Sequence, residues 1–277
     1  MGFEKNAAAL FLKMRTAGVK LDRVLTLGHQ DVHLDLGDYN RALKRLGRPP
    51  VKTLPAYANE LLLAMGATSV DSMDASGYEQ ASLTHDLNRV VPTEWNERFD
   101  LVFDGGTLEH VFDFPTAIKN CMRMVKPGGR FVSVTIPNNW CGHGFYQFSP
   151  ELFYRVFCAD NGFSIQEMYL AEIDGTAFAV KDPAAIGARV ELCNTRPVYL
   201  LVHARRDAVR EIFAKTPQQS DYVVHWGAAT RGGAKPVAAW KGYPGIRQLR
   251  KLLRARRELR PRSLKNRELF TPADLSF

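Results

Sequence analysis

The sequence lacks the features that mark secreted, membrane-spanning or zinc-binding proteins. No apolar run approaches the roughly 18 residues that a membrane-spanning helix requires. The N-terminal segment carries Glu4, Lys5, Lys13 and Arg15 and has no apolar stretch of the kind found in signal peptides. The four cysteines are scattered without a C-x-x-C pair, which argues against both a disulfide framework and a zinc site. We therefore predict a cytoplasmic protein and no metal site.

The composition also excludes a disordered or fibrous chain. Of the 277 residues, 45% are hydrophobic and 24% are charged, which is ordinary for a globular protein. This length suits one large domain or two small ones.

Basic and acidic residues balance over most of the chain, and the positive excess lies near its C-terminus. The formal net charge is +8, and 11 of the 37 basic residues but only 3 of the 29 acidic ones follow Trp240, which leaves 26 of each before it. Apolar residues at near-helical spacing predict a basic amphipathic helix over 246–259. Such a helix could meet an anionic membrane surface or, less favoured, RNA phosphates, or it could simply be a solvated surface helix.

Strand and helix patterns alternate along the chain, which favours a parallel sheet with helices on both faces. The predicted strands cover residues 23–28, 69–74, 81–86, 99–104, 130–136, 163–173 and 198–204. The predicted helices cover 4–15, 39–46, 57–65 and 116–125, and a further helix opens at Ser149-Pro150.

Two segments carry a resemblance to a known family. Residues 99–111 read Phe-Asp-Leu-Val-Phe-Asp-Gly-Gly-Thr-Leu-Glu-His-Val, and residues 123–130 read Arg-Met-Val-Lys-Pro-Gly-Gly-Arg. With the order of elements, they resemble the class I S-adenosylmethionine-dependent methyltransferases of the small-molecule branch, over roughly residues 21–205. The resemblance implies a Rossmann-like α/β fold, doubly wound, with a mostly parallel seven-stranded sheet, and S-adenosylmethionine as cofactor.

The resemblance also suggests how the chain is divided. We expect a methyltransferase-like domain over 1–205, with an enlarged first crossover at 47–67 and an inserted loop at 174–196. A linker or accessory segment over 206–240 and the basic tail over 241–277 would follow.

The predicted strand ends carry the residues that the family uses for its cofactor. By resemblance, Asp74 would hold the ribose hydroxyls, and Asp86 with the backbone amide of Leu87 would meet the adenine. Aspartates also end strands simply as turn residues, which is the alternative for both. The turn after the fourth strand would face the methionine part of the cofactor and consists of Asp104, Gly105 and Gly106.

The first strand departs from the family pattern of an acid followed by Gly-x-Gly-x-Gly. Thr26 takes the place of the acid, Gly28 matches the first glycine, and Gln30 and Val32 replace the other two. Either the loop takes a different path and uses Gln30 or Asp31 for the amino-acid end of the cofactor, or cofactor binding has been lost. The missing glycines also argue against a nicotinamide-dependent dehydrogenase.

The loop after the fifth strand is the predicted acceptor site. His143 lies between two glycines and is the first candidate for a general base, although it could equally be a hydrogen-bonded histidine of a packed loop. Asn138, Asn139 and Tyr146 are predicted to bind the substrate with His143. His110 is the second candidate base, and a role in supporting its loop is favoured for it.

The leading hypothesis is a cytoplasmic methyltransferase that acts on a small polar acceptor. Similarity to methyltransferases of surface glycan biosynthesis favours a sugar or glycan hydroxyl. The basic tail could bring the enzyme to the inner membrane face. The alternatives are an inactive scaffold of the same fold and an RNA-binding or RNA-modifying protein, although the turn Asp104-Gly105-Gly106-Thr107 does not resemble the motif used for methylating base amino groups.

Overall fold

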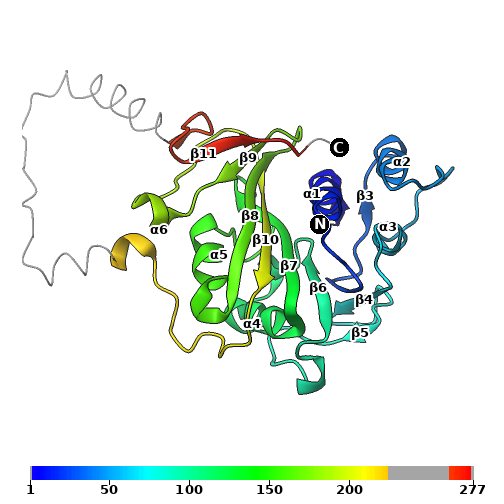
Figure 1. The fold of residues 1–277 in the computed structure, drawn as a ribbon, viewed down its shortest axis with the longest axis horizontal. Coiled ribbons are helices and arrows are strands. Elements are labelled where there is room, and N and C mark those ends of the chain that lie inside the picture. The colour runs from blue at the N-terminus through cyan, green and yellow to red at the C-terminus, as the bar shows by residue number, and fades with distance from the viewer. Residues whose placement is uncertain (1, 224–261, 276–277) are drawn as a thin grey trace, which may run out of the picture.

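The computed structural model describes residues 2–223 and 262–275 (Figure 1). The helices are α1 (Lys5–Thr16), α2 (Leu36–Arg45), α3 (Asn59–Ala64), α4 (Phe114–Met124), α5 (Pro150–Val156) and α6 (Pro183–Ile186), with 3-10 turns η1 (Thr93–Trp95), η2 (Leu108–His110) and η3 (Ala159–Asn161). The strands are β1 (Phe3–Glu4), β2 (Arg23–Leu27), β3 (Val32–His33), β4 (Ser69–Asp74), β5 (Leu83–Thr84), β6 (Phe99–Asp104), β7 (Val125–Asn138), β8 (Phe163–Glu172), β9 (Ala177–Val180), β10 (Val198–Arg206) and β11 (Phe270–Ala273).

The main sheet has the order β11-β9-β8-β10-β7-β6-β2-β4-β5. A parallel block is formed by β5, β4, β2, β6 and β7. Strand β10 is antiparallel to both β7 and β8, and β9 is antiparallel to both β8 and β11. The chain starts at the centre with β2, moves outward to β5 and returns to β6 on the other side of β2. This is the doubly wound arrangement, so the predicted fold class is confirmed.

The predicted number of seven strands is wrong, because the described sheet has nine. One additional strand, β9, lies in the segment 174–196 that was predicted to be a loop, and α6 follows it there. The other, β11, comes from the tail and pairs antiparallel with β9, from Phe270 opposite Val180 to Ala273 opposite Ala177. The sheet therefore uses residues on both sides of the predicted boundary at 205.

Helices cover both faces of the sheet, with α1, α2 and α3 on one side and α4 and α5 on the other (Figure 1). Alternate residues of β6 divide between the two layers: Leu101 and Phe103 pack with the α1 cluster, and Val102 packs with the α4 cluster. This alternation follows from the period of two in a strand, and it makes β6 buried on both faces.

Aromatic side chains fix α1 to the sheet. The ring centroids of Phe3, Phe11 and Phe103 lie 5.2–5.6 Å apart in edge-to-face and tilted arrangements. Glu4 caps this helix by accepting hydrogen bonds from the backbone N–H groups of Asn6 and Ala7.

The carboxyl ends of the central strands meet at one edge of the sheet. Leu27 at the end of β2 is in register with Met73 of β4 and with Asp104 of β6. The turns that follow these three strands are therefore neighbours. In an open α/β sheet, ligands bind at this edge and at the point where the strand order reverses, which here lies between β2 and β6.

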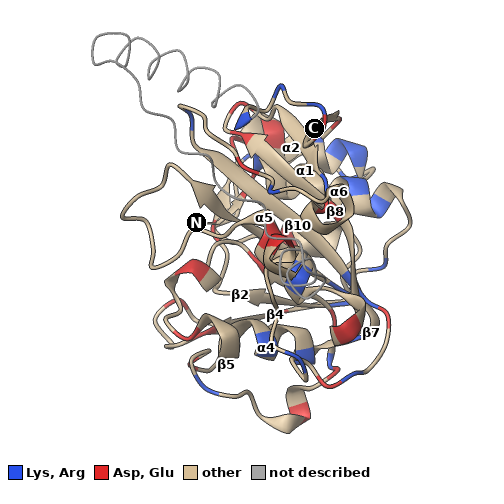
Figure 2. Ribbon diagram, turned by 90° about the vertical axis from the view of Figure 1, so that its left-hand side faces the viewer, with Lys and Arg blue, Asp and Glu red and all other residues tan. Residues whose placement is uncertain are grey.

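The described surface carries mixed charge. Residues 224–261, which include the predicted amphipathic helix, lie outside the described part and hold ten basic residues and one acid, so the described remainder holds 27 basic and 28 acidic residues. Figure 2 shows both signs interspersed over the described ribbon. No helix in this part of the chain is long and apolar enough to cross a bilayer.

Candidate active site

The turn after β2 is closed by its own side chains. The Thr26 hydroxyl donates to the Gly28 carbonyl at 2.8 Å, and Gly28 has a φ of +76°, which favours glycine. The Gln30 side chain folds back so that its Nε2 donates to the Leu27 carbonyl, and Thr107 donates to the same oxygen at 2.7 Å. Thr26 and Gln30 thus build a turn without the family's second and third glycines.

One polar atom of the Gln30 side chain is not hydrogen-bonded in the described structure. Gln30 is only 3% exposed, and its Oε1 has no hydrogen-bond partner among the described residues. A Cβ added to Gly105 would lie 2.0 Å from this oxygen, so the absence of a side chain at Gly105 makes room for it. A buried oxygen without a donor is costly, and it marks a place where a ligand's N–H group would be favourable.

The predicted aspartates of the β4 and β5 ends both form local turns. Asp74 Oδ1 accepts from the Ser76 backbone N–H at 3.0 Å. Asp86 Oδ1 accepts from the Asn88 side chain at 2.8 Å and from the Asn88 backbone at 2.9 Å, and these bonds hold the pKa of Asp86 below its usual value. Both carboxylates therefore serve as turn residues and stand at the predicted edge. The side chain of Leu87, which follows Asp86, is buried in the core cluster that includes α4.

Asp104 is fully buried, and its carboxyl group stabilises the turn after β6. Its Oδ1 accepts from the backbone N–H groups of Thr107 at 2.9 Å and Leu108 at 3.2 Å, and its Oδ2 accepts from Ser133 Oγ at 2.7 Å. Burial raises the pKa of Asp104 in spite of these bonds. The carboxyl group shapes the turn through Gly106, whose φ is +92°, and so sets the position of η2.

The turn η2 is bound to the loop after β7. The Glu109 carbonyl accepts from the backbone N–H groups of Phe145 at 2.8 Å and Tyr146 at 3.2 Å. A Cβ at Gly144 would lie 2.8 Å from the same carbonyl oxygen, so glycine at this position permits the close approach. The glycine beside His143 therefore joins two loops that are more than thirty residues apart in the sequence.

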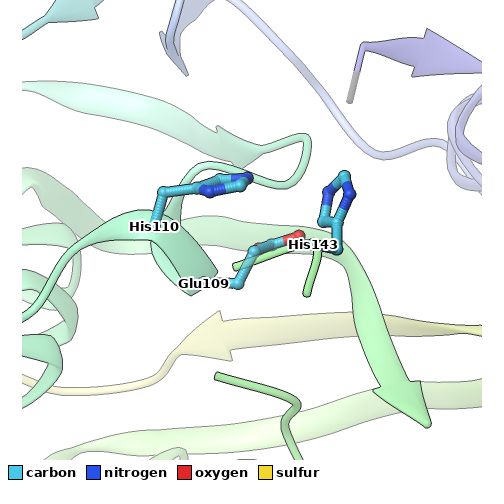
Figure 3. Close-up of side chains that lie close together, drawn as sticks. All are labelled: Glu109, His110 and His143. Atoms are coloured by element: carbon cyan, nitrogen blue, oxygen red, sulfur yellow. The ribbon is translucent and has the colours of Figure 1, made fainter. Parts of the chain in front are cut away.

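This junction brings Glu109, His110 and His143 together, with their side chains pointing toward one another (Figure 3). One ligand atom from each lies within 4.8 Å of the others, and the two imidazole centroids are 5.1 Å apart. Glu109 is fully buried; its Oε2 accepts from Thr135 Oγ1 at 3.0 Å, whereas its Oε1 has no partner in the described structure. The buried Nε2 of His143 is likewise without one there.

The electrostatics of the cluster follow from burial. Loss of solvent, followed by the charge of Asp104, raises the pKa of Glu109 to about 8. Burial lowers the pKa of His143, and burial together with the neighbouring His143 lowers the pKa of His110. Both shifts favour the uncharged imidazole, which can accept a proton or bind a metal ion.

The other predicted acceptor residues bind within the protein. The amide groups of Asn138 and Asn139 donate to Asn194 Oδ1 at 2.7 and 3.0 Å. The Tyr146 hydroxyl donates to the Phe112 carbonyl at 2.6 Å. These side chains anchor the loop after β7 to its neighbours, and their role in substrate binding stays a prediction.

The sequence did not point to Glu109, the most buried member of the cluster, or to Phe112 beside it. Glu109 entered only as part of a motif, although its position next to His110 was a usable signal. Phe112 and Phe145 are 71% and 66% exposed and pack edge-to-face with centroids 5.7 Å apart. Large exposed aromatic side chains beside a polar cluster are typical of a site that receives a ligand.

Comparison with known proteins gives one family match and one curated relative. A family model described as a methyltransferase domain matches residues 55–133, which include Asp74, Asp86 and Glu109. A ubiquinone biosynthesis O-methyltransferase of Rhodopseudomonas palustris is 28% identical over 146 residues, which cover 50% of this chain and 46% of the relative. The aligned part of the chain thus spans about half the length of that relative.

Similar solved structures are distant in sequence. An S-adenosylmethionine-dependent methyltransferase from Mesorhizobium loti is 20% identical, with a TM-score of 0.41, over 70% of this chain and 95% of that one. The N-methyltransferase NodS from Bradyrhizobium japonicum is 12% identical, with a TM-score of 0.40, over 73% and 94% of the two chains.

Proposed function

We propose that this chain is a class I S-adenosylmethionine-dependent methyltransferase that acts on a hydroxyl group of a small polar acceptor. One observation carries the proposal. Asp74 and Asp86, which lie in the region matched by the methyltransferase-domain model, stand at the same edge of the sheet as the Glu109, His110 and His143 cluster. The name of the curated relative, an O-methyltransferase, supports an oxygen acceptor.

The edge residues fit the groups of this cofactor. The unpaired Oε1 of Gln30 is an acceptor for its α-ammonium group, and the carboxylate of Asp74 is an acceptor for its ribose hydroxyls. Asp86 and the backbone of Leu87 would meet the adenine. Gly28, Gly105 and Gly106 keep the edge free of side chains. Asp104 contributes by shaping the turn, since its oxygens are already bonded.

The chain's own residues then prepare the acceptor. When bound, S-adenosylmethionine supplies an electrophilic methyl group on a positively charged sulfur. The unpaired Nε2 of His143 is suited to take the proton that the acceptor hydroxyl loses. The exposed rings of Phe112 and Phe145 offer apolar faces that orient the acceptor above the cluster.

We propose more specifically that the acceptor hydroxyl belongs to a sugar or a glycan. A sugar ring has an apolar C–H face that can pack on Phe112 or Phe145 and hydroxyls that can reach the imidazoles. A cytoplasmic location, with the basic tail at the membrane face, belongs to the same proposal and depends on residues outside the described part.

The ribose contact provides the test. Asp74→Ala should weaken S-adenosylhomocysteine binding by about tenfold or more, because a hydrogen bond to a charged group is lost. Asp174→Ala is the matched control, since Asp174 forms a similar turn with the Thr176 N–H in the β8–β9 connection. Isothermal titration of both variants measures the effect. Equal affinities for Asp74→Ala and the native chain would remove the ribose assignment, and no saturable binding by the native chain would favour the inactive scaffold.

A further inference from the structure

A proton transfer uses one unpaired atom, whereas the Glu109, His110 and His143 cluster has two. Neither Glu109 Oε1 nor His143 Nε2 has a hydrogen-bond partner among the described residues. We infer that these three side chains form a binding site for a divalent first-row transition-metal ion. The scattered cysteines led to the prediction of no metal site. The two histidines and the glutamate meet only in the folded chain. Two imidazoles and one carboxylate are a common ligand set for zinc and for non-haem iron, with coordination positions left open.

The buried carboxyl group is the strongest sign of a missing ligand. Glu109 is fully buried, and its Oε1 has no partner within the described part of the chain although Oε2 is bonded to Thr135. The unpaired Nε2 of His143 is a second buried donor at the same place. Buried polar groups in native proteins are nearly always satisfied, so two such atoms in one cluster point to an ion bound there.

The distances suit an open site that closes around an ion. The three ligand atoms lie within 4.8 Å of one another. Around a four-coordinate zinc ion with bonds near 2.1 Å, ligand atoms are about 3.4 Å apart. We expect rotation of the two imidazoles about their χ angles to supply this contraction.

The surrounding contacts hold the ligands in place. Thr135 fixes the rotation of the Glu109 carboxyl group, as outer hydrogen bonds commonly do for metal ligands. The bonds from the Phe145 and Tyr146 N–H groups to the Glu109 carbonyl fix the two ligand-bearing loops to each other. Gly144 permits this contact, so the backbone of the site is preorganised.

The donor types select among metals. Imidazole nitrogen suits zinc, iron, nickel and copper, whereas magnesium and calcium prefer sites made entirely of oxygen ligands. We therefore expect zinc and cobalt to bind and magnesium to bind poorly.

The chemical role of the ion rests on the proposed function. An acceptor hydroxyl bound at an open coordination position would become more acidic, because the ion stabilises the oxygen anion. His143 would then act as a ligand, and the proton of the hydroxyl would pass to solvent water instead of the imidazole. The exposed Phe112 and Phe145 beside the site leave it accessible to such an acceptor.

Metal titration tests the site without any turnover. The full chain, purified without a histidine tag and treated with a chelator, is titrated with zinc by calorimetry and with cobalt by visible absorption. We expect one ion per chain. His110→Ala and His143→Ala should each weaken binding by about tenfold or more. The control is His33→Ala, which removes an exposed histidine of β3 that is not a member of the cluster.

The results separate this inference from the proposed function. No zinc binding by the folded native chain, or equal binding by the native chain and both cluster variants, would overturn the metal site. Glu109→Gln can disturb a buried hydrogen bond, so the two histidine variants decide the question. S-adenosylhomocysteine is titrated into the same samples: metal binding without cofactor binding would leave the site standing and remove the proposed function.

Discussion

At the scale of single residues, the side chains of Thr26 and Gln30 close the turn after β2 by hydrogen bonds to its backbone. Thr26 replaces the usual acid and bonds the Gly28 carbonyl, and Gln30 fills the space that opens beside Gly105. The missing glycines could be read from the sequence. The direction of the Gln30 side chain could not, because it depends on Gly105, which lies 75 residues later in the chain.

Gly105→Ala tests this arrangement. Its Cβ would lie 2.0 Å from Gln30 Oε1 and 3.1 Å from a ring carbon of Phe103, so the variant should lose about 1–3 kcal/mol of unfolding free energy through overpacking. Because the closest atom is the tip of Gln30, the same substitution should cost less in a Gln30→Ala background. Urea unfolding of the four proteins measures the coupling. Equal costs in both backgrounds would contradict the contact.

At the scale of elements, the carboxylate of Glu167 connects α1, β8 and β10. Glu167 of β8 accepts from Lys13 of α1 at 2.7 Å and lies 3.3 Å from His203 of β10. It also accepts from Tyr169 on its own strand at 2.8 Å. Burial by itself would raise the pKa of Glu167, but these hydrogen bonds outweigh it and lower the pKa to about 2.

This pKa predicts a pH-dependent contribution to stability. Since the folded pKa lies below the usual 4.5, the stabilisation is fully present above pH 4.5 and is lost as the pH falls toward 2. Glu167→Gln should cost about 2 kcal/mol near neutral pH, with a deficit that shrinks in acid. Urea unfolding over this pH range checks it. A deficit that does not change with pH would mean that the charge of Glu167 is unimportant.

At the scale of the whole molecule, elements with strong local patterns were predictable, and long-range additions were not. Strands β4 and β6 have the predicted bounds, and β6 in particular is a short, mostly apolar run. Strand β11 pairs with β9 across about ninety residues of sequence, which no local pattern reports. The cluster of Glu109 and His143 was missed for the same reason.

Phe270 tests whether the C-terminal strand belongs to the domain. It is fully buried in the core cluster that includes α4 and α5. Phe270→Ala should therefore lower the unfolding free energy by about 3–5 kcal/mol, whereas Thr271→Ala, at an exposed position of the same strand, should change it by less than about 0.5 kcal/mol. Thermal and urea unfolding measure both. A negligible effect of Phe270→Ala would mean that β11 is not packed on the domain in solution.

We propose that the carboxyl edge of the sheet holds S-adenosylmethionine beside the Glu109, His110 and His143 cluster. A crystal structure of the chain with S-adenosylhomocysteine would show where the ligand binds. We expect the ligand between the ends of β2 and β6, with its ammonium group at Gln30 and its ribose at Asp74. A ligand bound elsewhere on the chain, or no ligand density at saturating concentration, would contradict it.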